Sequence, residues 1–176
     1  MIAFICHTNL TFNFMKLASL CFLLLFINPV PELSTLRAHY VSAATSQVSA
    51  DAFYKTLENI NENHDNHTIL AYKAASIVLL AKYENGLFSK TRLFNRGTSL
   101  LELAIKKAPD NYEARLIRLN IQDNVPWITG YTGDIKEDKA FLIKNYASQP
   151  NDLKAFTKAY IMQCDAFKAK EKIAFN

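Results

Sequence analysis

The sequence predicts an all-α protein of about seven helices joined by short loops. Three observations support this: the 176 residues include only 4 glycines and 5 prolines, half are apolar, and apolar residues recur every three or four positions. Few turn-forming residues disfavour a sandwich or barrel, whereas a spacing of three or four gives a helix one apolar face. A chain of this length is expected to form one domain whose core needs no disulfide or metal.

The first 31 residues have the pattern of a leader. Lys16 precedes an apolar run, residues 17–27, and a positive residue before about 7–15 apolar residues is typical of a signal peptide. Because residues 1–14 contain no Lys or Arg, Met15 is the expected true start. Cleavage at 28–31 has the better spacing from the apolar run, whereas the small residues at 41–44 better satisfy the cleavage rule.

This leader predicts export to the periplasm or the cell exterior, with residues 32–176 as a single helical domain. The alternative is a membrane anchor formed by an uncleaved 17–27, although a spanning helix usually needs about 17 or more apolar residues.

The first three helices are predicted at 32–46, 49–60 and 68–84. Ser49 is the expected N-cap of the second, because a serine side chain can accept a bond from a free amide there. The third is apolar on almost every side, which predicts a helix buried within the domain.

The fourth helix is predicted from Ser89, its expected cap, to 108, where Pro109 stops it. Gly97 within it indicates close approach of a neighbouring helix. The fifth, 112–121, follows a capping-box pattern over 110–113.

The sixth helix, 134–148, follows a second capping-box pattern at Asp134 and Glu137. The seventh opens at Pro150, and its predicted apolar stripe has helical spacing. The stripe consists of Leu153, Phe156, Tyr160, Cys164 and Phe167.

Helix starts recur at Thr68, Pro109 and Pro150, which are 41 residues apart. A period of this size predicts a helical repeat array. Segment 88–114 resembles a tetratricopeptide repeat in five positions: an aromatic, a small, a large, an alanine and a closing proline. They are Phe88, Gly97, Leu101, Ala104 and Pro109.

The resemblance implies stacked antiparallel hairpins, in a right-handed tetratricopeptide- or HEAT-like array or a compact bundle, that bind a protein or peptide. The sequence departs from the pattern where Ala81 and Asn85 replace its tryptophan and glycine. In the next repeat, Arg115 and Arg118 occupy apolar positions.

Composition and motifs disfavour several other functions. The net charge of +4 is concentrated nowhere except in a mild basic tail at 168–172, so no nucleic-acid surface is expected. His64 and His67 lie in a polar segment, which indicates a solvated loop rather than a metal site. Cys164, the one cysteine outside the leader, is expected to be a buried thiol. No catalytic, cofactor or metal motif is present, so we assign none of these roles.

Five residues are candidates for a binding surface. Arg115, Arg118 and Gln122 share a helix face that would either clamp a carboxylate or form internal salt bridges, to Glu84 or Glu102. Trp127 and Tyr131 lie in a long irregular segment that would be either a binding loop or a hydrophobic plug.

The leading hypothesis is a non-enzymatic, exported scaffold that binds a protein or peptide. The alternative is an exported enzyme or small-ligand binder with a pocket beside the Trp127 loop, where Arg115, Arg118 and Tyr131 supply polar contacts. A membrane partner is expected only if the leader is retained, in which case the chain is a tethered structural protein.

Overall fold

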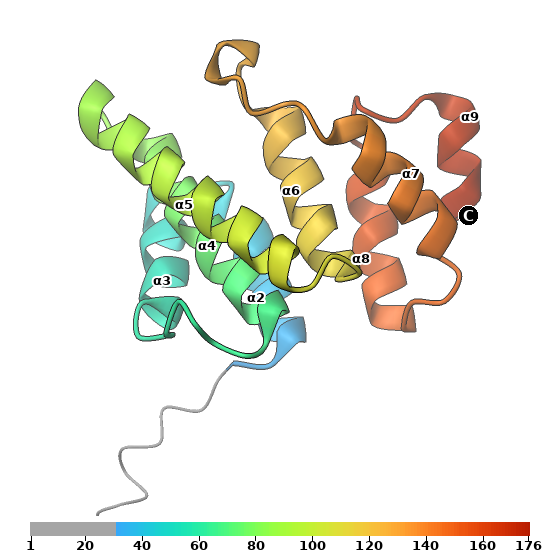
Figure 1. Ribbon diagram of the computed structural model, residues 1–176, viewed down its shortest axis with the longest axis horizontal. Coiled ribbons are helices and arrows are strands. Elements are labelled where there is room, and N and C mark those ends of the chain that lie inside the picture. The colour runs from blue at the N-terminus through green and yellow to red at the C-terminus, as the bar shows by residue number, and fades with distance from the viewer. Residues whose placement is uncertain (1–30) are drawn as a thin grey trace, which may run out of the picture. The chain divides into compact units, whose positions relative to one another are not determined.

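The computed structural model describes residues 31–176, and in this part of the chain every regular element is helical (Figure 1). The all-α prediction is confirmed. Met15, the apolar run 17–27 and the cleavage positions 28–30 lie outside the described residues.

The seven predicted helices correspond to α2–α8, and a short α9 follows them. The bounds are α2 Leu33–Ala43, α3 Gln47–Leu57, α4 His67–Tyr83, α5 Leu87–Lys107, α6 Tyr112–Asn124, α7 Ile135–Asn145, α8 Asn151–Ile161 and α9 Ala169–Lys172. Two 3-10 turns complete the set, η1 at Trp127–Thr129 and η2 at Ile173–Phe175. None of the helices within 31–176 is long and apolar enough to cross a membrane.

Three predicted caps are wrong. Ser46, rather than Ser49, caps α3, because its side chain accepts a bond from the Ser49 amide. Ser89 lies inside the first turn of α5 and donates its hydroxyl to the Gly86 carbonyl, so it leaves the helix start uncapped. Asp134 makes no cap bond because its carboxylate accepts from Gln122 instead.

The end of α8 also differs from the prediction. The helix stops at Ile161, but Cys164 and Phe167 are still buried. The chain turns back after α8, and Lys172 donates to the Met162 carbonyl, so the returning segment supplies the contacts that a longer helix was expected to make. Helical spacing therefore correctly predicted that Cys164 and Phe167 are buried, but it wrongly placed both in a helix.

Helix α4 is the central element of the first half. Its predicted burial is confirmed, and it packs against α2, α3, α5 and α6. The predicted close approach at Gly97 of α5 is confirmed too. A Cβ there would lie 2.6 Å from Cγ2 of Val78 and 2.9 Å from the carbonyl oxygen of Ala74.

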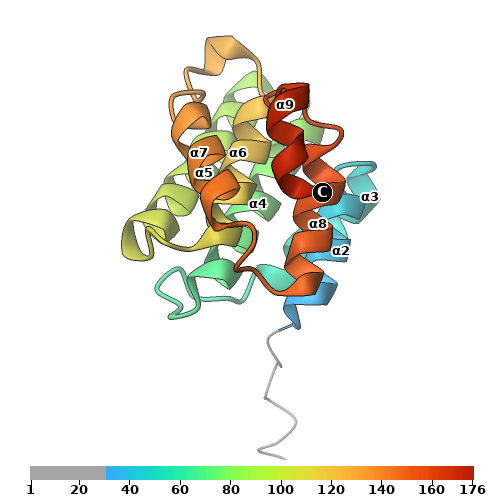
Figure 2. The same ribbon diagram turned by 90° about the vertical axis from the view of Figure 1, so that its right-hand side faces the viewer.

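Helix α6 lies between two hydrophobic cores (Figures 1 and 2). The first core is built by α2–α5 with Ile117 and Ile121 of α6. The second is built by α7, α8 and the C-terminal segment with Leu116 and Leu119 of α6. Because positions three or four apart share a helix face, Ile117 and Ile121 face the first core while Leu116 and Leu119 face the second, so α6 contributes to both cores at once.

Candidate functional site

Arg118 on α6 is the centre of a polar network that joins three helices. Its guanidinium donates to both carboxylate oxygens of Asp138 on α7, at 2.7 and 2.8 Å, and to Glu102 on α5 at 2.9 Å. The Asp138 side chain is completely buried. Burial alone would lower the pKa of the Arg118 guanidinium, but the hydrogen bonds and charge of Asp138 outweigh it and hold that pKa above its usual range.

Arg115 lies one turn before Arg118 and joins the same network. It donates to Asp138 at 3.0 Å and to Glu137 at 2.8 Å, and its guanidinium carbon lies 4.4 Å from the ring centre of Phe141. Both arginines therefore form internal salt bridges. The predicted bridge to Glu102 is confirmed for Arg118, whereas that to Glu84 is wrong, because Glu84 accepts from the Gly86 amide.

Gln122 and Tyr131 extend the network toward the loop after α6. Gln122 donates to Asp134 at 2.9 Å, and Tyr131 donates its hydroxyl to Glu102. Burial first, and then the bond to Glu102, raise the pKa of the Tyr131 phenol. Four of the five candidate residues are thus brought together, and each of the four has a hydrogen bond to another protein group.

Trp127, the fifth candidate, makes no side-chain hydrogen bond to this network within the described part of the chain. Its side chain is 82% exposed, and that of its neighbour Ile128 is 77% exposed. Trp127 and Ile128 therefore do not form the predicted hydrophobic plug, and that interpretation is wrong for these two residues. Only residues on either side of them in the loop pack against the protein. Val125 and Tyr131 pack against the first core, and the Tyr131 ring meets Phe94 edge-on at 5.9 Å.

The backbone of this loop forms a closed turn. The Thr129 amide donates to the Pro126 carbonyl and the Gly130 amide to the Trp127 carbonyl, both at 3.0 Å. Gly130 has φ +68°, a conformation that side-chain-bearing residues rarely adopt, and this residue ends η1. The turn therefore presents Trp127 and Ile128, which we call the η1 tip, as two adjacent apolar side chains at the apex of a closed turn.

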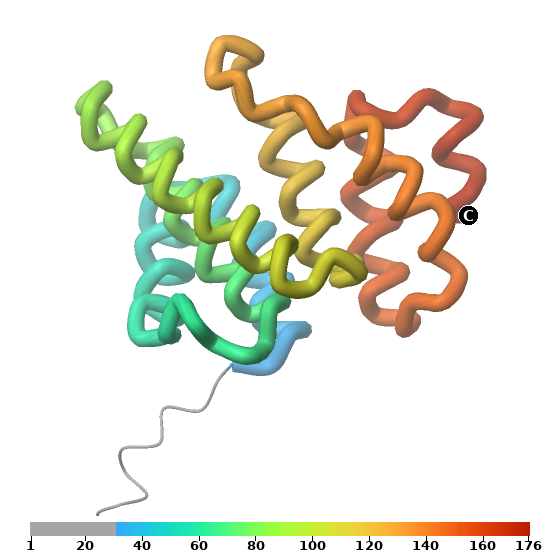
Figure 3. Tube along the Cα trace, in the orientation of Figure 1, coloured from blue at the N-terminus to red at the C-terminus, as the bar shows by residue number. Residues whose placement is uncertain are grey.

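A second exposed apolar pair lies at the start of α5. Leu87 is 74% and Phe88 91% exposed, and we call this pair the α5 tip. The first turn of α5 and the loop with η1 both project at the upper end in Figure 1, and the Cα trace in Figure 3 follows each outward and back. We call this end of the helical unit the tip end. The sequence carried a signal for the α5 tip, namely two large apolar residues directly after Gly86.

A second buried ion network was missed by the sequence reasoning. Arg37 of α2 donates to both oxygens of Glu113 on α6, each at 2.8 Å, and to Asp152 of α8 at 2.6 Å. The hydroxyl of Tyr72 on α4 also donates to Glu113. The predicted capping box is therefore wrong in part: Asn111 caps α6, but the Glu113 carboxylate faces Arg37. Sequence separations of 76 and 115 residues left no local signal for these pairs.

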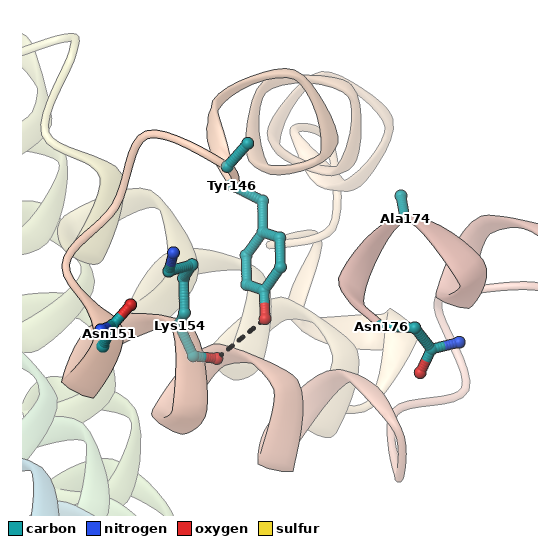
Figure 4. Close-up of a pocket in the computed structure, with 6 residues that line it drawn as sticks. Tyr146, Asn151, Lys154, Ala174 and Asn176 are labelled. Atoms are coloured by element: carbon teal, nitrogen blue, oxygen red, sulfur yellow. Dashed lines mark hydrogen bonds between the residues drawn. The ribbon is translucent and has the colours of Figure 1, made fainter.

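Two open hollows are found on the surface of the described residues, and neither is lined by a residue of the two networks. One, of about 450 Å³, is lined mainly by Tyr146, Asn151, Lys154 and Asn176, and the Tyr146 hydroxyl donates across it to the Lys154 carbonyl (Figure 4). The other, of about 480 Å³, is lined by residues of the loop before α7, of α7 itself and of the C-terminal segment. Neither is lined by Arg115, Arg118 or Tyr131.

His64, which could have bound a metal, and Cys164, which could have reacted as a thiol, make hydrogen bonds within the protein instead. Within 31–176, no three His, Cys, Asp or Glu side chains are grouped so that they could hold a metal ion. His64 accepts a bond from the Asn66 amide at 3.0 Å. The Cys164 thiol is buried, as expected, and donates to Asp123 at 3.0 Å, and burial raises its pKa.

No protein-family model matches the chain, and neither the curated proteins nor the solved structures include one that matches it.

Proposed function

We propose that this protein is a non-catalytic helical scaffold that acts outside the cytoplasm by contact with a larger partner at its tip end. The proposal rests on one observation: the α5 tip and the η1 tip expose large apolar side chains on helices that buried ion pairs hold together. Exposed apolar side chains that group together, as Trp127 does with Ile128 and Leu87 with Phe88, are typical of interaction surfaces. The resemblance to tetratricopeptide repeats supports an array of stacked hairpins, and it implies a protein or peptide partner.

The alternative, an enzyme or small-ligand binder beside the Trp127 loop, has less support. It needs Arg115, Arg118 and Tyr131 to face a pocket, but these groups donate to Glu137, Asp138 and Glu102. A ligand carboxylate would have to displace an existing carboxylate partner from each arginine.

The contact proposal is tested by photo-crosslinking in the native host. A benzophenone amino acid is placed at position 88 or 127, and a control is placed at position 173, where Ile173 is 67% exposed on η2. We expect adducts from 88 and 127 but not from 173, identified by mass spectrometry. Equal adducts from all three positions, or none from the tips, would overturn the proposal.

Export is supported by the apolar run after Lys16, and the fold favours one of the two cleavage regions. A cut at 43 or 44 would remove α2 and its buried Leu36, Arg37 and Tyr40. We therefore propose cleavage at 28–31, which leaves the helical unit intact. N-terminal sequencing of fractionated native protein tests this: a soluble exported species that begins near residue 32 is expected, and a cytoplasmic species that begins at Met1 would contradict export.

A further inference from the structure

We propose that the tip end docks on an anionic lipid bilayer, with the α5 tip and the η1 tip entering the headgroup layer. This inference rests on the contact surface proposed above and assigns to it a lipid partner in place of a protein. Three independent features of the tip end lead to it: the composition of the tips, the cations beside them, and their separation into two projections.

The tips are built from residues that suit the membrane interface. Neither 85–89 nor 125–133 contains a charged side chain, so neither segment has to desolvate an ion on entering the headgroup layer. Tryptophan is the side chain most typical of this layer, because its ring is apolar and its N–H remains hydrogen-bonded to water or headgroups. Trp127 with Ile128, and Phe88 with Leu87, each present such an apolar pair.

The polar backbone groups of the tips are partly satisfied within the tips themselves. In the η1 tip, the Thr129 amide and hydroxyl both donate to the Pro126 carbonyl. At the α5 tip, the Ser89 hydroxyl and the Lys90 amide donate to the Gly86 carbonyl. Entry into a less polar layer therefore leaves these carbonyls bonded.

Exposed cations lie close to the tips along the chain. Lys90 and Arg92 are exposed on α5, and Lys136 is exposed on α7; among residues 31–176 none of the three has a carboxylate within salt-bridge distance. Lys82 is also exposed and donates to the Ala44 carbonyl. The first turn of α5 contains no acid, and the nearby Glu84 accepts from the Gly86 amide. Lysine and arginine beside an apolar insertion favour anionic lipid.

The arrangement of the tips favours a flat partner. They lie on separate elements and project at the same end as two distinct points (Figure 1). Neither of the two hollows described above is lined by a tip residue, so neither of them joins the tips into a peptide groove. A bilayer can contact both projections at once, whereas a short peptide would need such a groove.

Trp127 provides the measurement, since it is the only tryptophan in the chain. The full-length chain is mixed with phosphatidylcholine vesicles, with or without phosphatidylglycerol, that carry brominated acyl chains. Quenching of Trp127 reports contact of the η1 tip itself, so lipid binding by residues 17–27 is not mistaken for it. We expect quenching and a blue shift of Trp127 emission with the anionic vesicles.

Variants separate insertion from nonspecific binding. Combined Leu87→Ser and Phe88→Ser, or Ile128→Ser, should reduce the quenching, and Ile173→Ser, a matched change of an exposed apolar residue on η2, should leave it unchanged. Combined Lys90→Gln and Arg92→Gln should weaken partition into anionic vesicles about 25-fold, since each cation near an anionic surface contributes about fivefold. Circular dichroism checks that every variant is folded.

Absence of quenching in anionic vesicles, or an equal loss in the Ile173→Ser variant, would overturn the lipid assignment. The crosslinking test then distinguishes the two proposals: protein adducts at 88 and 127 without vesicle quenching would leave the contact surface standing and replace lipid by a protein. Absence of both would overturn both.

Discussion

Asp138 is the residue on which the polar network around α6 depends. Its carboxylate is completely buried, and its negative charge is balanced by the guanidinium groups of Arg118 and Arg115, which donate hydrogen bonds to it. An isolated buried charge is far more costly than an exposed one, so each partner has a large effect when it is removed.

Arg118→Ala should lower the free energy of unfolding by about 3–5 kcal/mol, because it leaves a buried carboxylate short of its main partner. Arg96→Ala is the matched control: Arg96 pairs with Glu62 on the surface, where the loss should be about 0–1 kcal/mol. Urea unfolding followed by circular dichroism measures both. A loss at Arg118 as small as that at Arg96 would mean that the network does not stabilise the fold.

Asp152 gives a pH-dependent prediction. The hydrogen bond from Arg37, followed by the bond from the Leu153 amide, lowers the pKa of this carboxyl below its usual range. The unfolded chain, with the ordinary higher pKa, therefore binds a proton more readily, and the contribution of Asp152 to stability is lost as pH falls through its folded-state pKa.

Asp152→Asn should thus be less stable than the natural chain at pH 7, and the gap should narrow as pH falls below the usual aspartate range. Urea unfolding at several pH values measures the gap. If the gap stayed constant down to acid pH, the carboxylate would not act through its charge.

At the scale of elements, the contact between α4 and α5 depends on Gly97. Alanine there would gain about 1 kcal/mol of helix propensity, but its Cβ would meet the backbone and a β-branched side chain of α4. We expect Gly97→Ala to lower the free energy of unfolding by about 1–3 kcal/mol net, as measured by urea unfolding.

Gly86→Ala is the matched control for this change. The only one of its neighbours that its added Cβ would approach more closely than 3 Å is the hydroxyl of Ser89, the end of a side chain that can rotate away, whereas Glu84 Oε1 would lie at 3.5 Å, an ordinary contact distance. We expect a change within about 0.5 kcal/mol, and equal losses at both glycines would argue against close helix approach as the cause.

Elements could be predicted where the signal is local. The apolar composition of α4, the stop at Pro109 and the glycine of α5 depend on residues a few positions apart, and all three predictions hold. Caps were less predictable, because Ser46 and Ser49 are equally good cap residues and the path of the chain out of α2 selects between them.

The candidate site was predictable only in part. Shared helix spacing correctly predicts that Arg115, Arg118 and Gln122 lie together. It does not predict Asp138, the partner of both arginines, and it assigns Asp134, the partner of Gln122, to a helix cap. The pairing of Arg37 with Glu113 depends on how α2 and α6 pack, and no pattern within either helix encodes that. Exposure of Trp127 follows from the closed turn, which the sequence indicates only through Gly130.

For the helical unit as a whole, the central question is whether its two cores unfold together. Phe175 in η2 is fully buried in the second core, where its ring meets Tyr146 at 4.8 Å and Phe167 at 5.5 Å. Helix α6 supplies residues to both cores, so a mutation that destabilises one core should also destabilise the other.

Phe175→Ala should cost about 3–5 kcal/mol, and Ile173→Ala, its exposed neighbour, less than about 0.5 kcal/mol. Hydrogen exchange of the α4 amides tests the coupling: their protection should fall by the same free energy as the global stability. Unchanged α4 protection in Phe175→Ala would mean that the two cores unfold independently.

The ion pairs of Arg37 also determine when α2 can finish folding. Synthesis proceeds from the N-terminus, so Glu113 follows Arg37 by 76 residues and Asp152 by 115. At about 5–20 residues per second, the interval to Asp152 is about 6 to 23 s. Until Glu113 has been made the guanidinium has neither carboxylate, although α3 and α4, which pack against α2, precede Glu113 in the chain. The first described helix to be made therefore completes its ion pairs only after the first turn of α8 has been made.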